Sequence, residues 1–271
     1  MSLPTPGPER TCLITGASSG IGVDLARELA KRGHGVTLVA RRDAPLRELA
    51  AELSAAHGVR AEVATADLSD EAAREHLVAD VQKRGLTVEV LVNNAGFSTM
   101  GPVHKSVAAK EISMIRTDVE AVAHLCSAFL PGMVERGRGA VLNVASTAAF
   151  QPLPGQAGYG ASKAFVLSYS QAVAEEVRGR GVTVTVLCPG PVETGFADAM
   201  GLDTEIANGS LPRFMWVTAE AVAADAVEGL DRGRGVVIPG LPNKVGARLA
   251  HLTPRRLLLP ILSSRHPSRR T

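Results

Sequence analysis

Short apolar runs alternate with longer amphipathic stretches along most of this chain of 271 residues. The apolar runs have the length of strands, and most are apolar at nearly every position, which is typical of strands covered on both faces of a sheet. Seven such runs are found, at residues 11–16, 35–40, 61–67, 88–96, 139–146, 182–190 and 235–240.

The stretches between these runs carry helical signals. Residues 21–33 place apolar side chains at helical spacing, a second helix is expected over about 45–56, and Ser69 or Asp70 is positioned to cap a third. A helix-length connection between successive strands favours parallel pairing with right-handed crossovers. The pattern therefore predicts a doubly wound α/β (Rossmann) fold, a seven-stranded parallel sheet with helices on both faces, in a single domain.

The composition fits such a core and excludes several other classes. Hydrophobic residues make up 45% of the chain and aromatic residues only 3%, so the core should be aliphatic. The three cysteines, Cys12, Cys126 and Cys188, form no disulfide framework or metal-binding pattern, and no metal site is expected. The start of the chain has no signal-peptide pattern, and no apolar run approaches the roughly 20 residues of a membrane-spanning helix. We expect a cytoplasmic protein.

A glycine-rich turn, "TGASSGIG" (15–22), follows the first apolar run. Glycines at 16, 20 and 22 would let the backbone approach a pyrophosphate, and the next helix would offer its positive N-terminus. Many such turns are purely structural. Its place between the first strand and the first helix favours dinucleotide binding.

The second strand ends in "VARRD", where an NAD-preferring protein would usually carry Asp or Glu. The guanidinium groups of Arg41 and Arg42 are suited to a 2′-phosphate. We therefore predict a preference for NADP(H), with NAD(H) possible. The alternative is two solvated arginines at the start of a helix.

"YGASK" (159–163) places Tyr159 and Lys163 four residues apart, on one face of a helix. By itself this spacing also fits an ordinary surface pair.

Together these motifs resemble those of the classical short-chain dehydrogenases/reductases over about residues 10–240. The resemblance also rests on Asp67-Leu68, on "NNAG" (93–96), on Ser146 thirteen residues before Tyr159, and on "PGPVET" (189–194). It implies an oxidoreductase that moves a hydride between nicotinamide and a carbonyl or secondary alcohol. The implied cofactor contacts are Gly16, Ser18, Ser19, Gly20, Ile21, Gly22, Arg41, Arg42, Asp67, Leu68, Asn94, Ala95, Gly96, Tyr159, Lys163, Pro189, Gly190, Val192 and Thr194.

The resemblance also implies the catalytic roles. Tyr159 would be the general acid or base, Ser146 would donate a hydrogen bond to the substrate oxygen, and Lys163 would favour the phenolate and bind the nicotinamide ribose. Moving a phenol pKa from ~10 to near neutrality requires about 4 kcal/mol of preferential stabilisation, for which a lysine cation is a reasonable source. Ser146 alone would be an unremarkable serine at the end of a strand.

Asp118 departs from the family pattern, because it aligns with the asparagine of the usual catalytic tetrad. A main-chain role could survive the substitution, but an ionised carboxylate cannot donate hydrogen bonds as an amide does. It could also raise the pKa of Lys163 and weaken its effect on Tyr159. Either the alignment slips by a residue or the proton relay is altered.

The substrate loop is expected over about 195–216. Apolar residues there and in neighbouring loops could line a pocket for a lipophilic ketone, aldehyde or alcohol, or they could simply close the core. These residues are Phe97, Met100, Phe150, Phe196, Met200, Leu202, Phe214, Met215 and Trp216.

We divide the chain into a catalytic domain, residues 1–243, and a leucine-rich basic tail, residues 244–271. The tail holds seven of the 29 Lys and Arg residues and none of the 27 acidic ones, so residues 1–243 carry a net charge of −5. It could pack on its own body or on a partner subunit, or lie on an anionic membrane, although Pro254 and Pro260 interrupt a continuous helix. No nucleic-acid motif is present.

The main functional alternative is an NADP(H)-binding sensor or scaffold that has lost turnover, which the change at Asp118 would favour. Intact Ser146, Tyr159 and Lys163 argue against it. From the resemblance we also expect a homodimer or homotetramer.

Overall fold

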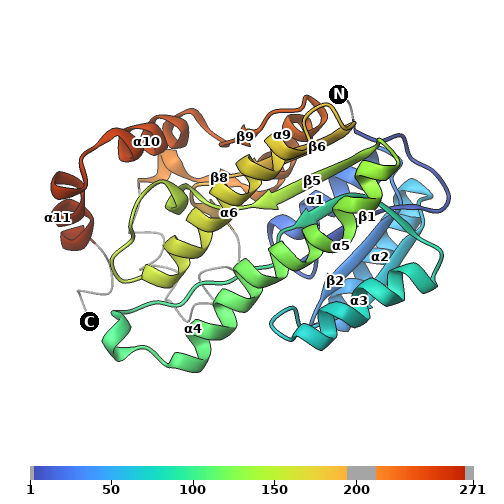
Figure 1. Cartoon of the computed structure of the whole chain (residues 1–271), viewed down its shortest axis with the longest axis horizontal. Helices are drawn as coiled ribbons and strands as arrows, with labels where there is room; N and C mark the ends of the chain where they lie inside the picture. The colour runs from blue at the N-terminus through green and yellow to red at the C-terminus, as the bar shows by residue number, and fades with distance from the viewer. Residues whose placement is uncertain (1–2, 194–211, 266–271) are drawn as a thin grey trace.

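The computed structural model describes residues 3–193 and 212–265. Its main sheet has seven strands in the order β3-β2-β1-β4-β5-β6-β9, and every pairing is parallel (Figure 1). The strands are β1 (Arg10–Thr15), β2 (Val36–Ala40), β3 (Ala61–Thr65), β4 (Thr87–Asn93), β5 (Gly139–Val144), β6 (Val182–Leu187) and β9 (Val236–Val237). The doubly wound, seven-stranded parallel sheet predicted from the sequence is confirmed.

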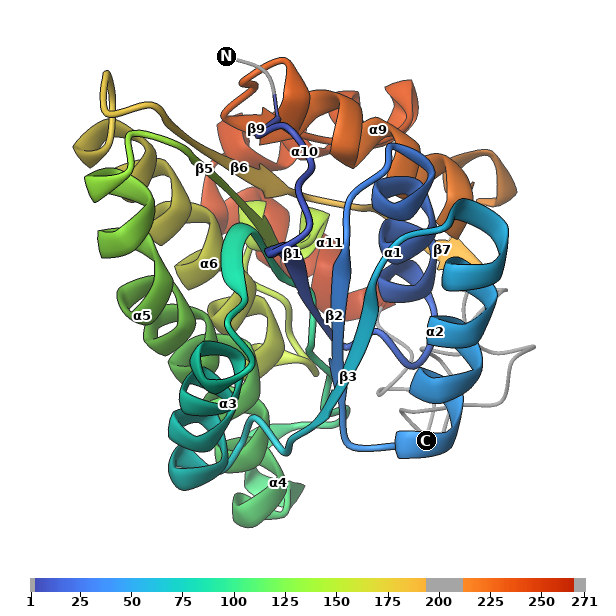
Figure 2. The same cartoon turned by 90° about the vertical axis from the view of Figure 1, so that its right-hand side faces the viewer.

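Helices cover both faces of this sheet (Figure 2). On one side lie α1 (Ile21–Lys31), α2 (Asp43–His57) and α9 (Ala219–Asp231), and on the other α3 (Glu71–Lys83), α5 (Ala121–Glu135) and α6 (Ala157–Glu176). Within β1, Ile14 packs into the first layer and Leu13 into the second, because successive strand side chains point to opposite faces. This is why the strands are apolar throughout.

The strand order reverses around β1, which pairs with β2 on one side and with β4 on the other. In such sheets the loops after these strands form a crevice in which ligands bind. β4 ends at Asn93 rather than at residue 96, because the following backbone turns towards the loop after β1. β9 is also shorter than the predicted run 235–240.

The helix before α5 contains an irregular turn. The short helix α4 (Ala108–Ile115) continues into a π-helical turn, η2 (Arg116–Glu120), before α5 begins. Single π turns within helices occur frequently at functional sites. Here the turn carries Asp118, which is buried.

The C-terminal segment forms two helices, α10 (Leu241–Leu252) and α11 (Arg255–Arg265), with Pro254 between them and Pro260 within the second. The boundary that we drew after residue 243 lies inside α10. Asn243 is buried there, and its Nδ2 donates hydrogen bonds to the carbonyls of Met215 and Pro239. In the part of the chain that the structure describes, no helix is long and apolar enough to cross a membrane.

The remaining elements are short. They are η1 (Val103–Lys105), η3 (Thr147–Phe150), η4 (Arg213–Met215) and a two-stranded sheet of β7 (Val192–Glu193) and β8 (Val217–Thr218).

Candidate active site

The turn after β1 lies against the turn after β4. Asn94 donates from Nδ2 to the carbonyl of Thr15 at 2.9 Å, and the Thr15 hydroxyl accepts from the backbone N–H groups of Asn94 and Ala95 at 2.9 and 3.0 Å. Thr15 is buried and was not singled out from the sequence. Its position directly before the first glycine of the glycine-rich turn is the signal that could have identified it.

Glycine is required at two positions of this turn. Gly16 has a φ of 67°, which L side chains rarely adopt, and a Cβ on Gly22 would lie 2.3 Å from the carbonyl oxygen of Gly16. Helix α1 then begins after Gly20, with no side chain capping its first N–H groups. A cradle of this kind, at a helix N-terminus, fits the pyrophosphate of a dinucleotide.

The predicted adenosine-side residues gather near this cradle. Arg42 donates from Nη2 to the carbonyl and hydroxyl oxygens of Ser18, at 3.1 and 3.2 Å, and both Arg41 and Arg42 are exposed. Burial raises the pKa of Asp67, but hydrogen bonds from Ser69 and the charge of Arg41 outweigh it, so this pKa lies below its ordinary value. Asp67 is therefore ionised at neutral pH.

Ser146 and Tyr159 meet beyond the end of β5. Ser146 caps η3, its Oγ accepting from the N–H of Ala148 at 3.1 Å, and it lies 3.5 Å from the carbonyl oxygen of Pro189. A hydrogen bond joins the side chains of Ser146 and Tyr159. Tyr159 as a whole residue is partly buried.

Lys163 lies on the inner side of Tyr159. Its side chain is 6% exposed, and Nζ donates to the carbonyl of Val144 at 3.2 Å and lies 5.6 Å from the centroid of the Tyr159 ring. The spacing of four residues therefore reflects a buried cluster and not a helix surface pair.

Asp118 joins this cluster. Its Oδ1 accepts from the N–H of Phe97 at 3.0 Å, and its Oδ2 lies 3.1 Å from Nζ of Lys163. A Cβ on Gly96 would lie 3.0–3.1 Å from both carboxylate oxygens and from that nitrogen. Glycine at 96 thus leaves room for a buried ion pair.

Burial and the neighbouring charges shift the pKa values of the three groups in opposite directions. Burial lowers the pKa of Lys163, but the carboxylate of Asp118 and the Tyr159 oxygen more than offset this, and the pKa is raised. Burial raises the pKa of Tyr159; Lys163 lowers it, and Asp118 raises it again. Burial also raises the pKa of Asp118 against the opposing effect of Lys163. Burial is the largest of the influences on Tyr159, and together with the charge of Asp118 it keeps the pKa of the phenol above its ordinary value although Lys163 lowers it.

The residues of "PGPVET" are only partly described. Pro189 and Gly190 contact the centre of the site and helix α10: a Cβ on Gly190 would lie 2.4 Å from Oδ1 of Asn243. Thr194 lies outside the described residues. Asn243, which packs directly against this motif, is the last residue of the catalytic domain as we drew it, and no sequence signal distinguished it.

The candidate pocket residues differ in how far they are exposed. Phe97, Met100, Phe150, Met215 and Trp216 are partly buried, whereas Phe214 is 70% exposed. Phe196, Met200 and Leu202 lie outside the described residues.

A cavity of about 420 Å³ opens on the other side of α6, between the loop after η3 and Arg255. The α6 residues lining it are Ala157, Gly160, Ala161 and Ala164. By helical spacing this face points away from Tyr159 and Lys163.

Among residues 3–193 and 212–265, no three His, Cys, Asp or Glu side chains come together as a set of metal ligands.

Comparison with known proteins places this arrangement in a family. The model of the short chain dehydrogenase family matches residues 10–204. An NADP-dependent 3-hydroxy acid dehydrogenase of Escherichia coli K12 is 37% identical over 181 residues, which are 66% of this chain and 71% of the relative.

Two solved structures are similar over nearly the whole chain. A short-chain dehydrogenase of Sphingobium yanoikuyae in complex with NADPH has a TM-score of 0.80 and 34% identity, with 92% of this chain and 94% of the other covered. A 7β-hydroxysteroid dehydrogenase has a TM-score of 0.85 and 27% identity, with coverage of 97% and 100%. The fold, the ordered motifs and these matches agree, and the chain belongs to the short-chain dehydrogenase family.

Proposed function

We propose that this protein is an NADP(H)-dependent oxidoreductase that interconverts a lipophilic ketone or aldehyde and the corresponding alcohol. The observation that carries the proposal is the cluster of Ser146, Tyr159 and Lys163, which lies beside a glycine-lined cradle at the carboxyl ends of the central strands.

The cradle formed by Gly16, Gly20 and Gly22 would hold the pyrophosphate, and Arg41 and Arg42 would hold the 2′-phosphate. The nicotinamide, when bound, supplies or accepts the hydride. NADP(H) is also the cofactor named for the dehydrogenase from Escherichia coli and for the complex from Sphingobium yanoikuyae.

In carbonyl reduction, Tyr159 would donate its phenolic proton to the substrate oxygen as the hydride arrives at the carbon. Ser146 would donate a hydrogen bond to the same oxygen while negative charge develops there. In alcohol oxidation, the Tyr159 phenolate would take the hydroxyl proton, so this direction requires the ionised form.

Lys163 would favour that ionised form through its charge, 5.6 Å from the ring centroid. Asp118 opposes it, because a second negative charge in the cluster disfavours the phenolate. We infer that Asp118 keeps Lys163 protonated and holds Tyr159 as a neutral acid, which suits carbonyl reduction.

A lipophilic substrate is supported by the partly buried apolar side chains of Phe97, Met100 and Trp216 near the site. The similar proteins are named for substrates of different polarity. One relative is a 3-hydroxy acid dehydrogenase, and one structural neighbour is a hydroxysteroid dehydrogenase. A substrate panel must therefore include both kinds.

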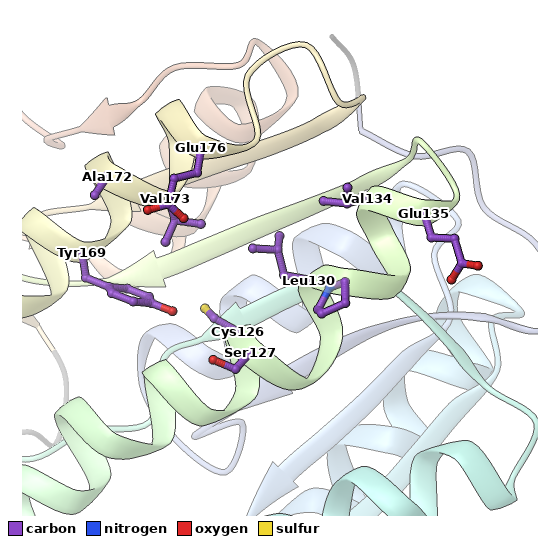
Figure 3. A pocket seen from close by; sticks show the side chains of 10 residues that line it. Cys126, Ser127, Leu130, Val134, Glu135, Tyr169, Ala172, Val173 and Glu176 are labelled. Atoms are coloured by element: carbon purple, nitrogen blue, oxygen red, sulfur yellow. The ribbon is translucent and has the colours of Figure 1, made fainter.

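We also propose a homo-oligomer formed through α5 and α6. An open groove of about 660 Å³ runs between these helices, lined by apolar side chains such as Leu130 and Val134, with Tyr169 at one end (Figure 3). Phe165, stacked on Tyr169, adds a further exposed apolar side chain on α6. The family resemblance implies a dimer or tetramer, and this groove is the surface that we propose its subunits would bury.

The test is NADPH consumption with a panel of steroid and other bulky ketones, aldehydes and 3-oxo acids, using wild type and Tyr159→Phe. Both proteins are first shown to bind NADPH. Turnover that is lost in Tyr159→Phe supports the proposal, and the preferred panel members test its lipophilic part. Equal turnover by both proteins would contradict the role of Tyr159. If wild type and Asp118→Asn both bind NADPH but neither shows turnover, the result would favour the alternative of a non-catalytic NADP(H)-binding sensor.

A further inference from the structure

Helix α10 exposes an apolar face to the outside of the molecule. Leu241, Val245, Leu249 and Leu252 follow one another at helical spacing, and their exposed fractions are 73, 50, 61 and 77%. A helix on the surface of a globular protein normally places its polar residues outward and its apolar stripe inward. On α10 the apolar stripe faces outward.

The inner face of α10 already packs on the body. Asn243 and Ala247 are buried, and the ring of His251 makes an edge contact with Phe150 of η3, with 6.4 Å between centroids. Arg255, at the start of α11, donates to the carbonyl of Phe150. The two helices are therefore anchored through one side, and the exposed stripe contributes nothing to that anchoring.

Exposed apolar side chains also occur on α11, which follows α10 at the edge of the molecule (Figure 1). Leu257 and Ile261 lie one turn apart there, and both are at least half exposed. Half of the twelve large apolar side chains that are exposed among the described residues thus fall between Leu241 and Ile261. Such a concentration marks an interaction surface on a monomer.

The charges around the stripe indicate what covers it. Exposed Lys244 and Arg248 lie beside it on α10, and exposed Arg255 and Arg256 open α11. No acidic residue occurs from Lys244 to the end of the sequence, whereas residues 1–243 have a net charge of −5. A twofold interface with a second copy would bring the same patch to face itself, cation against cation. An anionic lipid surface instead complements both the apolar and the cationic groups.

We propose that α10 and α11 form a docking surface for anionic phospholipid membranes. The leucine stripe would enter the boundary between headgroups and acyl chains, and the four cations would contact phosphates. Because the two helices contact η3, which begins after Ser146, docking would hold the candidate active site close to the bilayer.

The test is co-sedimentation of the full chain with vesicles of phosphatidylcholine, with or without phosphatidylglycerol. Wild type should pellet with the vesicles containing phosphatidylglycerol, and less so at raised salt. Leu249→Asp/Leu252→Asp should remove this binding. Lys244→Glu/Arg248→Glu should weaken it by about thirty-fold or more, since each cation near such a surface contributes about a factor of five. The control, Val103→Asp/Val107→Asp, adds the same charges at another exposed apolar pair and should bind as wild type does.

NADPH affinity, measured in parallel, should be unchanged in every variant, which separates this proposal from the one on the active site. Failure of wild type to bind phosphatidylglycerol vesicles would overturn the docking surface, and so would full binding by Leu249→Asp/Leu252→Asp. Sedimentation velocity without vesicles measures the oligomeric mass of wild type and of Leu249→Asp/Leu252→Asp. If that variant lowers the oligomeric mass while wild type ignores vesicles, the stripe is a contact between protein chains.

Discussion

Nζ of Lys163 lies 3.1 Å from Oδ2 of Asp118, and both side chains are sealed in the interior beside Tyr159. The π-helical turn η2 and the absence of a side chain at Gly96 make this contact possible. The carboxylate keeps the lysine charged and at the same time opposes the loss of a proton from Tyr159. We therefore expect the proposed proton chemistry to depend on three groups and not on a tyrosine–lysine pair alone.

Asp118→Asn should move the pH profile of alcohol oxidation to lower pH. The carboxylate raises the pKa of Tyr159, so removing its charge lets the phenolate form earlier as pH rises. The measurement is kcat against pH for wild type and variant. Glu120→Gln, which removes a half-exposed carboxylate from the same turn, is the matched control and should leave the profile in place. A profile displaced upward, or unmoved, in Asp118→Asn would contradict this role.

Lys163→Met should destabilise the fold by about 3–5 kcal/mol, because it leaves the buried carboxylate without its counter-charge. Urea unfolding at neutral pH measures the loss. The double variant Lys163→Met/Asp118→Asn should recover much of it, since an amide is cheaper to bury than an unpaired charge. Equal losses in the single and double variants would show that the ion pair is not the cause.

Gly22→Ala should weaken NADPH binding by at least about tenfold, equivalent to roughly 1.4 kcal/mol. Its Cβ would lie 2.3 Å from the backbone carbonyl oxygen of Gly16, and a backbone atom cannot move aside as a flexible side chain can. Fluorescence titration with NADPH measures the effect. Gly235→Ala is the control: nothing lies within 4 Å of its Cβ, and binding should stay as in wild type.

Arg41→Asp should weaken the binding of NADPH much more than that of NADH, because the 2′-phosphate is what distinguishes the two ligands. Titrations with both nucleotides give the ratio of dissociation constants. Arg47→Asp, another exposed arginine that lies further along α2, serves as the control. Equal effects of Arg41→Asp on the two ligands would remove the argument for a 2′-phosphate site.

The free energy of unfolding should fall as pH rises above about 9. Burial raises the pKa of Cys126 to about 11 and that of Cys188 to about 12, from 9.0. The unfolded chain therefore loses these protons first, and the stabilisation present below pH 9 is lost towards the folded-state pKa values. At pH 11 each of these two thiols should lower the free energy of unfolding by on the order of 2 kcal/mol.

Urea unfolding at pH 8 and pH 11 measures this loss of stability. The free energies of unfolding at the two pH values should differ less in Cys126→Ala than in wild type. The native thiols should also resist alkylation, because a buried thiol stays protonated. Rapid alkylation of the folded protein, or stability independent of pH over this range, would contradict the prediction.

The sequence by itself determined the architecture, and it predicts most of the candidate site. Apolar runs of strand length, separated by helical stretches, admit few arrangements other than a parallel sheet covered on both faces, since a one-sided sheet would leave half of each strand's apolar side chains in water. The order and spacing of Gly16–Gly22, Ser146, Tyr159 and Lys163 match the pattern of the short-chain dehydrogenase family, and that resemblance predicts that these residues share one site.

Contacts between residues that lie far apart in the sequence were decided only by the tertiary structure. The sequence left open whether Asp118 reaches Lys163, 45 residues away; the π-helical turn and the space at Gly96 bring them to 3.1 Å. Thr15 and Asn243 acquire their roles in the same way, from partners on other loops. The tail resembled any basic, leucine-rich segment until packing fixed one side of α10 on the body and left its leucines outside. Hydrophobic periodicity encodes which face of a helix is apolar, but only the packed fold decides which face is covered.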